Sequence, residues 1–166
     1  MLNYIFQDFK TRKFSSRETF GRVIVDRGCS AVLLYRVSSW CWHHKLKLCA
    51  IIFKQFNILL NSCDIAYQAE IGSGFRIYHG VGIVLAPCQI GENFSIYQNV
   101  TIGRNIKSNI NGRFTPIIGN NCEFYTGCVV AGPIEIGDNV RIGANAVVMK
   151  DIPSNSTAVG VPAKVI

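Results

Sequence analysis

Hydrophobic residues recur with a period of six between residues 65 and 148. The period slips by one residue between Ile83 and Ile90, and a longer insertion separates Ile102 from Ile118. A glycine follows the hydrophobic residue at six of these positions. The repeat positions are Ile65, Ile71, Ile77, Ile83, Ile90, Ile96, Ile102, Ile118, Phe124, Val130, Ile136, Ile142 and Val148.

A period of six places no continuous stripe on an α-helix, and a β-sandwich would alternate with turn signals about every 8–12 residues. Short strands with inward aliphatic residues and tight corners fit the spacing. We therefore predict a mainly β fold, a parallel β-helix over residues 63–152, with three six-residue units per triangular coil. An inserted loop is expected at about 103–116. Two prolines predict a closing loop and tail over 153–166.

The first 62 residues follow a different pattern and predict a small α-helical segment. Apolar residues recur at three- and four-residue steps over 22–44 and 46–61, which predicts two helices, whereas residues 1–20 predict an irregular lead-in. We expect the helices to dock on the first coil and cover its open edge. The apolar stripe expected to face the core comprises Leu48, Ile51, Ile52, Phe56 and Leu59.

Charge is concentrated in this helical segment. The chain has a net charge of +7, and residues 1–62 hold ten Lys and Arg against three Asp and Glu. Both tryptophans, Trp40 and Trp42, also lie there. Two hypotheses follow: the helices cap the coils with solvated charges, or the segment touches an anionic membrane surface at the inner face. We favour capping, and we expect no nucleic-acid partner.

The cysteines indicate a reducing, cytoplasmic environment. Their number, seven, is odd, and none has the C-x-x-C spacing of a zinc site. Cys122 and Cys128 fall where a small inward residue is needed, so we interpret them as core residues. No apolar run reaches the length of about 18 residues expected of a spanning helix, and the N-terminus does not read as a signal peptide.

Several motifs carry a resemblance to a known family. They are CDIAYQAEIGSGFRIYHGVGIVLA, IYQNVTIG, IGANAVVMKDIP and the final GVPAKV. Together they resemble the hexapeptide-repeat acyltransferases, in the serine O-acetyltransferase-like branch. The short basic N-terminal segment with YRVS is most similar to the short bacterial polysaccharide O-acetyltransferases of the colanic-acid type. The resemblance implies left-handed coils, against the usual crossover rule, and a homotrimer with grooves between adjacent subunits.

His79 is the only histidine in the predicted coils. A lone histidine is more often structural, but the setting YHGVGIV resembles the family motif whose histidine takes the proton from the acceptor hydroxyl. An imidazole suits this role because it exchanges a proton near neutral pH. Asp64 lies 15 residues earlier, close to one coil, so the two are expected to be neighbours. The resemblance makes Asp64 the carboxylate that orients the base, although a capping role would explain it equally well.

The donor implied by the resemblance is acetyl-CoA, with no metal. Its matching positions lie at the loop start, in two coil corners and in the tail. Small residues would admit the pantetheine arm, basic residues would meet phosphates, and backbone amides would stabilise the oxyanion. Each basic residue taken singly is more readily explained as a solvated surface charge. The positions are Gly103, Arg104, Thr126, Gly127, Arg141, Ala144 and Lys164.

The chain departs from the serine enzymes where the acceptor should bind. Tyr78 replaces the aspartate that precedes the catalytic histidine, and Phe114-Thr115 replaces an Arg-His pair in the loop. Aromatic and amide groups suit an uncharged sugar better than a free amino acid. The residues expected to contact such an acceptor are Tyr78, Tyr97, Gln98, Arg113 and Phe114.

These observations predict an O-acetyltransferase that moves acetyl from acetyl-CoA to a sugar hydroxyl of a bacterial surface polysaccharide or its precursor. The alternative within the same chemistry is serine O-acetylation. An alternative of another class is a β-helix scaffold without catalysis. A metal-dependent β-helix hydratase would need several histidines around zinc, whereas the coils contain one.

Overall fold

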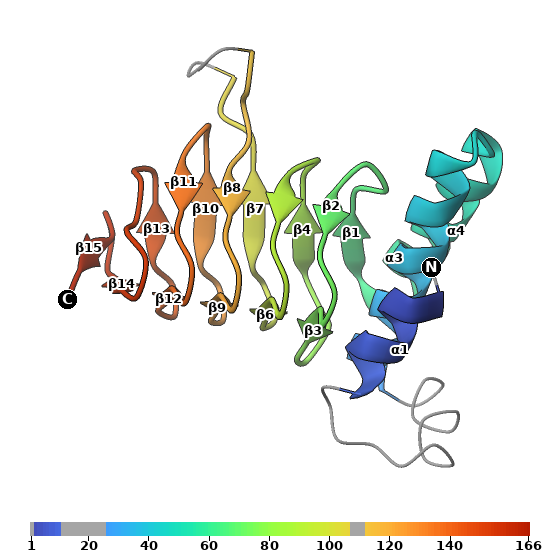
Figure 1. Cartoon of the computed structure of the whole chain (residues 1–166), viewed down its shortest axis with the longest axis horizontal. Helices are drawn as coiled ribbons and strands as arrows, with labels where there is room; N and C mark the ends of the chain where they lie inside the picture. Colours follow the sequence, from blue (N-terminus) through green and yellow to red (C-terminus); the bar gives the residue numbers. More distant parts are fainter. Residues whose placement is uncertain (1, 11–25, 107–111) are drawn as a thin grey trace.

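The protein consists of helices packed on one end of a long β-helix (Figure 1). The computed structural model describes residues 2–10, 26–106 and 112–166. The start of the helix predicted over 22–44 and part of the inserted loop lie outside these residues. The helices are α1 (Leu2–Lys10), α3 (Arg27–His43) and α4 (Lys47–Asn61).

Three sheets form the sides of the β-helix, and every pairing between successive coils is parallel. Sheet A contains β1 (Cys63–Ile65), β4 (Ile83–Leu85), β7 (Thr101–Gly103), β10 (Val129–Ala131) and β13 (Val147–Val148). Sheet B contains β2 (Glu70–Ile71), β5 (Gln89–Ile90), β8 (Ile117–Ile118) and β11 (Glu135–Ile136). Sheet C contains β3 (Arg76–Ile77), β6 (Ser95–Ile96), β9 (Glu123–Phe124), β12 (Arg141–Ile142), β14 (Thr157–Val159) and the antiparallel β15 (Lys164–Val165).

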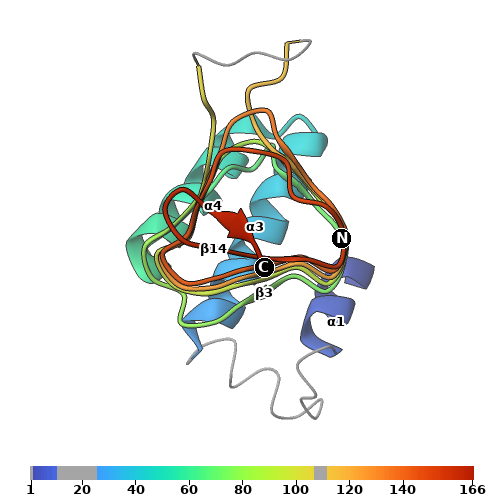
Figure 2. The ribbon, with the colours of Figure 1, turned by 90° about the vertical axis from the view of Figure 1, so that its left-hand side faces the viewer.

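Viewed along the coil axis, the sheets enclose a triangle (Figure 2). The chain passes through sheets A, B and C clockwise while it advances toward the viewer, so the coils are left-handed. The structure therefore confirms the predicted left-handed parallel β-helix with its small N-terminal helical segment. This hand is the opposite of that of most parallel crossovers.

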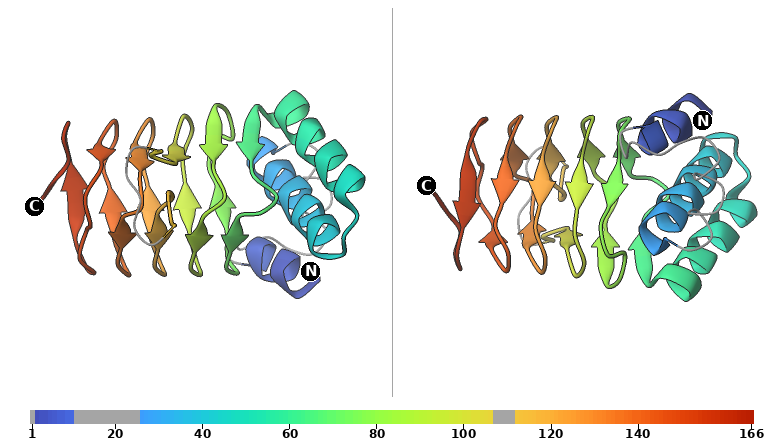
Figure 3. Two further views of the ribbon diagram at one scale, coloured as in Figure 1. Left: turned by 90° about the horizontal axis from the view of Figure 1, so that it is seen from above. Right: turned by 90° about the horizontal axis from the view of Figure 1, so that it is seen from below.

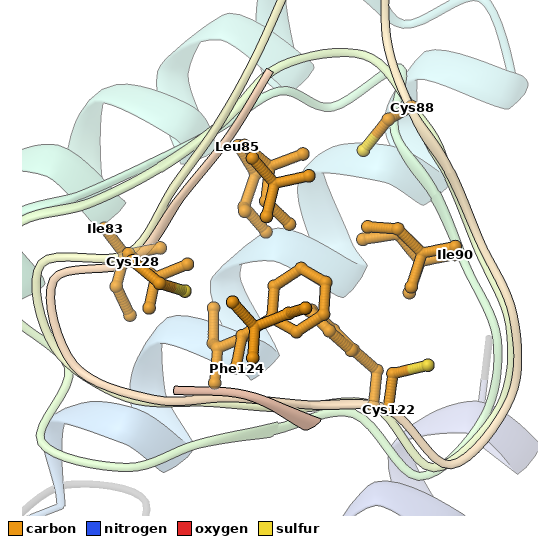
Figure 4. Close-up of a cluster of buried hydrophobic side chains, with 14 of the residues drawn as sticks. Ile83, Leu85, Cys88, Ile90, Cys122, Phe124 and Cys128 are labelled. Carbon is orange, nitrogen blue, oxygen red and sulfur yellow. The ribbon is translucent and has the colours of Figure 1, made fainter. Parts of the chain in front are cut away.

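The core is a set of stacked inward side chains (Figure 4). One column runs through Ile77, Ile96, Phe124, Ile142 and Ala158 in sheet C. Each aliphatic residue buried in this way contributes about 1.5–3 kcal/mol. At one corner, Asn side chains with positive φ form a hydrogen-bonded ladder through Asn93, Asn121, Asn139 and Asn155.

The register in sheet A corrects one repeat position. Ile65 pairs with Leu85, which in turn pairs with Ile102, so Leu85 and not Ile83 occupies the repeat position. Both residues are buried because they are two apart on one strand, and spacing alone therefore could not separate them. The corner between Ile77 and Leu85 is consequently two residues longer than the regular corners, and this longer corner contains His79.

The coils continue beyond residue 152, where the sequence predicted a closing loop. Strand β14 pairs in parallel with β12 and places Ala158 in the core column. Strand β15 then pairs with β14 in the antiparallel direction and ends the sheet.

Helix α3 caps the first coil. Ala31, Val32 and Tyr35 belong to the buried core, and the Tyr35 hydroxyl donates to the carbonyl of Ala69. Burial raises the pKa of Tyr35 to about 12. Helix α1 forms where an irregular lead-in was predicted, and it docks through a buried ion pair between Asp8 and Arg36 (2.8 Å).

Helix α4 faces the opposite way from the prediction. Its buried residues are Ala50, Asn57 and Asn61, which pack against α3. The predicted core stripe points to solvent, because the opposite side of α4, with Ala50 and the hydrogen-bonded Asn57 and Asn61, packs on α3. The exposed residues are Leu48, Ile51, Ile52, Phe56, Leu59 and Leu60.

The cysteines are all free, and six of the seven are buried, Cys49 being the exception. Burial raises the pKa of Cys88 and of Cys128 to about 12. No helix within the described residues is long and apolar enough to cross a membrane.

Candidate active site

His79 lies in the long corner between β3 and β4. Its φ of 52° is in the left-handed region, which a non-glycine residue occupies at some cost. The corner ends at Gly82, whose backbone N–H donates to the carbonyl of Ser62. The imidazole is exposed to solvent, so it is accessible to a substrate.

The start of α3 supplies the opposite wall of a groove of about 410 Å³ at this corner. Asp26 and Arg27 line it together with Tyr78, His79 and Val81. The Asp26 carboxylate also caps α3, because it accepts from the backbone N–H groups of residues 28 and 29 (2.8 and 3.1 Å). The groove therefore combines a base with one acidic and one basic side chain.

Asp26 and Arg27, which line this groove, were not among the predicted site residues. They stand 53 and 52 positions before His79, and no spacing rule connects them with it. The available signal was the N-cap pattern, an Asp followed by a helical segment, which predicts where a helix begins but not what that end faces.

Asp64 is in the middle strand position of β1, in sheet A. Its Oδ1 lies 2.8 Å from Nζ of Lys54 in α4, and its side chain is 46% exposed. Among the described residues, no hydrogen bond or ion pair joins Asp64 to His79. Asp64 is thus paired with a lysine, and its role as the carboxylate that orients His79 stays a prediction.

Four predicted residues stack along the edge that begins at His79. The backbone N–H of Gly127 donates to the carbonyl of Gln98, and that of Asn145, next to Ala144, donates to the carbonyl of Thr126. The edge therefore brings Gln98, Thr126, Gly127 and Ala144 onto successive coils. The buried Oε1 of Gln98 has no hydrogen-bond partner in the described part of the chain.

A ladder of tyrosine rings lies beside this edge. Tyr78 stacks on Tyr97, with ring centroids 4.9 Å apart, and Tyr97 stacks on Tyr125 at 5.2 Å. The Tyr125 hydroxyl donates to Glu123 Oε2. Burial, together with the Glu123 carboxylate, raises the pKa of Tyr97 and of Tyr125.

A second group of predicted residues lies at a different edge, where the inserted loop leaves sheet A (Figure 1). Gly103 ends β7, and Arg104 follows it. A Cβ atom on Gly103 would meet nothing closer than 4.0 Å, so the space beside this backbone could admit a slender ligand arm. Arg113 donates to the Pro133 carbonyl and to Glu135, and Phe114 follows it.

The remaining two basic residues lie on sheet C. Arg141 in β12 is 3.8 Å from Glu123, and its side chain is 66% exposed. Lys164 is exposed in β15. The structure therefore divides the predicted residues between the His79 edge, the loop edge and sheet C of one chain. Among the described residues, no group of three metal-binding side chains was found.

Comparisons with known proteins agree on one group. The family described as "Bacterial transferase hexapeptide (six repeats)" matches residues 115–150. A serine acetyltransferase of Staphylococcus aureus (strain Mu50) is 35% identical over 153 residues, which are 92% of this chain and 71% of that protein. The chain spans 57–71% of the length of the curated relatives it matches.

Solved structures give the same result. A serine acetyltransferase in complex with CoA has a TM-score of 0.76 and 30% identity, and covers 84% of this chain and 57% of its own. The apoenzyme of soybean serine acetyltransferase has a TM-score of 0.87 and 27% identity, and covers 99% of this chain and 68% of its own.

These findings correct two predictions. The sugar hydroxyl of a polysaccharide as acceptor is contradicted, because the relatives and structural neighbours are serine acetyltransferases. The expected closeness to polysaccharide O-acetyltransferases is likewise not supported, whereas the serine acetyltransferase-like branch is. The sugar prediction rested on Tyr78 and Phe114-Thr115, which stand where the serine enzymes carry an aspartate and an Arg-His pair.

Proposed function

Because the chain belongs to the serine acetyltransferase family, we propose that it transfers an acetyl group from acetyl-CoA to the hydroxyl of serine. The observation that carries this proposal is the groove that His79 shares with Asp26 and Arg27. The seven free cysteines support a reducing, cytoplasmic location for the reaction.

In the proposed reaction, His79 acts as general base. Its imidazole takes the proton of the serine hydroxyl, and the oxygen attacks the carbonyl carbon of the thioester. The tetrahedral intermediate collapses, the carbon–sulfur bond breaks, and the imidazolium returns the proton to the CoA thiolate. Backbone N–H groups near Gly103 are the proposed donors to the oxyanion.

A free amino acid needs a cation for its carboxylate and an anion for its ammonium group. The residue before His79 is Tyr78, which provides neither. Arg27 and Asp26 line the same groove and carry the two required charges. We assign Arg27 to the serine carboxylate, because a guanidinium binds a carboxylate in bidentate geometry, and Asp26 to the ammonium group.

The catalytic assembly is proposed to be a homotrimer. One chain presents His79 at one edge of the triangle and Gly103 with the inserted loop at another. A site that needs both groups is completed when the loop edge of one copy meets the His79 edge of the next. Asp64, held by Lys54, is proposed to approach the imidazole in the loaded assembly.

The experiment is a steady-state acetylation assay with acetyl-CoA and L-serine. His79→Ala is expected to lower kcat by about 10²–10⁴-fold, the usual effect of losing a general base. Asp26→Asn keeps an N-cap side chain but removes the charge, so it should raise KM for serine without unfolding α3. Arg27→Gln should do the same, whereas Lys150→Gln, an exposed cation elsewhere, should not.

Two results would contradict the proposal. If the wild-type protein shows no saturable acetylation of serine, the assigned acceptor is wrong. If Asp26→Asn and Arg27→Gln turn over serine with an unchanged KM, serine binds elsewhere.

Mixing His79→Ala with a Gly103→Trp variant tests the trimer, because sites shared between copies should recover part of the activity that each variant lacks alone.

A further inference from the structure

An ion pair joins the second helix of the cap to the first strand of the β-helix. Nζ of Lys54 in α4 lies 2.8 Å from Oδ1 of Asp64 in β1, and the two side chains are 25% and 46% exposed. Figure 3 shows α4 at the helical end of the molecule, where its last turn leads into the first coil. An ion pair this exposed contributes little to stability, so the fold does not depend on it.

The connection between α4 and β1 fixes the direction from which the lysine approaches. Helix α4 ends at Asn61, and Ser62 turns the chain with a φ of 54° before β1 begins. Asn57 and Asn61 form hydrogen bonds with α3 on the other side of the helix. Lys54 precedes Asn61 by about two helical turns. Because the helix is anchored to α3 and to β1, Lys54 has a defined place beside that strand.

The corner that contains His79 lies one coil later at the same edge. The backbone N–H of Gly82, which ends that corner, donates to the carbonyl of Ser62 (2.9 Å). Asp64 pairs with Val84 of the next strand and lies between two buried residues of its own strand, so its side chain points away from the core. The end of α4, the first strand and the His79 corner therefore follow one another at one edge of the triangle.

Two carboxylates belong to the elements that meet at this corner, and they differ in what they bind. Oδ1 of Asp26 accepts two backbone N–H groups at the start of α3. Asp64 holds a lysine on Oδ1, and within the described residues no hydrogen bond or ion pair involves its Oδ2. A carboxylate that orients a catalytic imidazole accepts the ring N–H through one oxygen. Asp64 can therefore bind a cation and an imidazole at the same time, one on each oxygen.

The ion pair restricts how the Asp64 side chain can turn. A half-exposed aspartate without a partner populates several staggered rotamers, and ordering it costs conformational entropy. A cation at a defined position favours the rotamers in which Oδ1 meets it. The second oxygen is then held in a narrow range of directions before substrate binds, and such pre-alignment of a catalytic group increases the rate of reaction.

We propose that Lys54 is a positioning residue for acetyl transfer, which holds Asp64 through Oδ1 so that Oδ2 faces the ring N–H of His79. This inference rests on the proposed function, in which His79 removes the proton of the serine hydroxyl. Lys54 acts through Asp64 and contacts neither serine nor acetyl-CoA. The helical cap then has two roles, because it closes the core and also aligns the base.

Steady-state acetylation of L-serine tests the role of the lysine. Lys54→Met keeps the length of the side chain but removes the charge, and it should lower kcat about tenfold, less than the roughly 10²-fold cost of displacing a catalytic group by 1 Å. KM for serine should stay near the wild-type value, because Asp26 and Arg27 are unchanged. Lys54→Arg should restore most of kcat, since a guanidinium also pairs with a carboxylate. The matched control is Lys47→Met, an exposed lysine of the same helix whose Nζ lies 5.9 Å from the Trp42 ring, and it should keep the wild-type kcat.

A double variant shows whether Lys54 acts through Asp64. Asp64→Asn should lower kcat more than Lys54→Met does. If the lysine acts only by holding the carboxylate, Lys54→Met combined with Asp64→Asn should be no slower than Asp64→Asn alone. Multiplication of the two losses would show that Lys54 acts independently of Asp64 and would overturn the inference.

Thermal unfolding establishes that each variant is folded, and Lys54→Gln replaces Lys54→Met in every comparison if the latter does not fold. A folded Lys54 variant with the wild-type kcat would overturn the inference, and so would an equal loss in Lys47→Met. The proposed function is judged separately from the wild type and His79→Ala. If the wild type acetylates serine and His79→Ala does not, while Asp64→Asn keeps the wild-type kcat, the proposed function stands and the role of Lys54 falls. If the wild type does not acetylate serine, both fall.

Discussion

Gly28 connects the cap of the coils to the corner that holds His79, and Gly28→Ala tests that connection. A Cβ atom at this position would lie 2.1 Å from the carbonyl oxygen of Ile77, two residues before the histidine. Ordinary contacts begin at 3.4 Å. Helix α3 and the His79 corner must therefore separate by about 1 Å to accept a single methyl group, because neither backbone can rotate out of the way.

Two effects of opposite sign act on stability. Forcing extra volume into a packed site costs about 1–3 kcal/mol, while alanine is favoured over glycine in a helix by about 0.8–1 kcal/mol. The net loss should be no more than about 2 kcal/mol, which lowers Tm by roughly 4–8 °C for a chain of this size. The protein remains folded at room temperature.

Activity should respond more strongly than stability. A displacement of about 1 Å at a catalytic group can cost about 10²-fold in rate. We therefore expect kcat/KM for serine to fall about 10²-fold.

Two assays compare Gly28→Ala with the wild type. Thermal unfolding, monitored by circular dichroism, gives Tm, and steady-state acetylation of serine gives kcat/KM. If Gly28→Ala has a higher Tm than the wild type and an unchanged kcat/KM, helix propensity dominates. The close contact between α3 and β3 would then not position the His79 corner, and the reasoning would be refuted.

Three further predictions concern stability and reactivity. Arg36→Met leaves the buried Asp8 carboxylate without its cation and should lower the free energy of unfolding, measured with urea, by about 3–5 kcal/mol. The double variant of Arg36→Met with Asp8→Asn should lose less stability. Equal losses in the two variants would contradict the ion-pair account. In the native protein at neutral pH, a thiol reagent should modify Cys49 alone, because the other six cysteines are buried. The Cys49→Ser variant should remain unlabelled until denaturant is added. Mass spectrometry would show any other labelled thiol. The folded pKa values of Cys88 and Cys128, about 12, exceed the ordinary value of 9.0, so the folded protein retains protons that the unfolded chain releases. The free energy of unfolding should therefore fall as pH rises from 9 toward 12. In Cys88→Ala this fall should be shallower.

The β-helix could be predicted because its interactions repeat locally. Each inward residue contacts its equivalents in the next coils, so the same requirement recurs along the chain and becomes a visible period. The columns through Ile77 and Ile96 show this directly. The choice between Ile83 and Leu85 was not visible, since both point inward from one strand and only pairing with Ile65 distinguishes them.

The candidate base was visible for a different reason. His79 lies within a contiguous motif, and its corner is built from residues that are adjacent in sequence. Asp26 and Arg27 enter the same groove from a helix more than 50 residues earlier. Their approach depends on how closely α3 docks on β3, and the absence of a side chain at Gly28 permits that contact.

Helix α4 shows the same division between local pattern and tertiary packing. The sequence by itself determined that residues 47–61 form a helix with an apolar stripe, because helical periodicity is a local property. It did not determine which side of that helix would be covered. Only the tertiary structure decided that, because the side with Ala50, Asn57 and Asn61 packs on α3, where the hydrogen-bond partners of the two asparagines lie 26 and 31 residues earlier, and the apolar stripe is left on the other side.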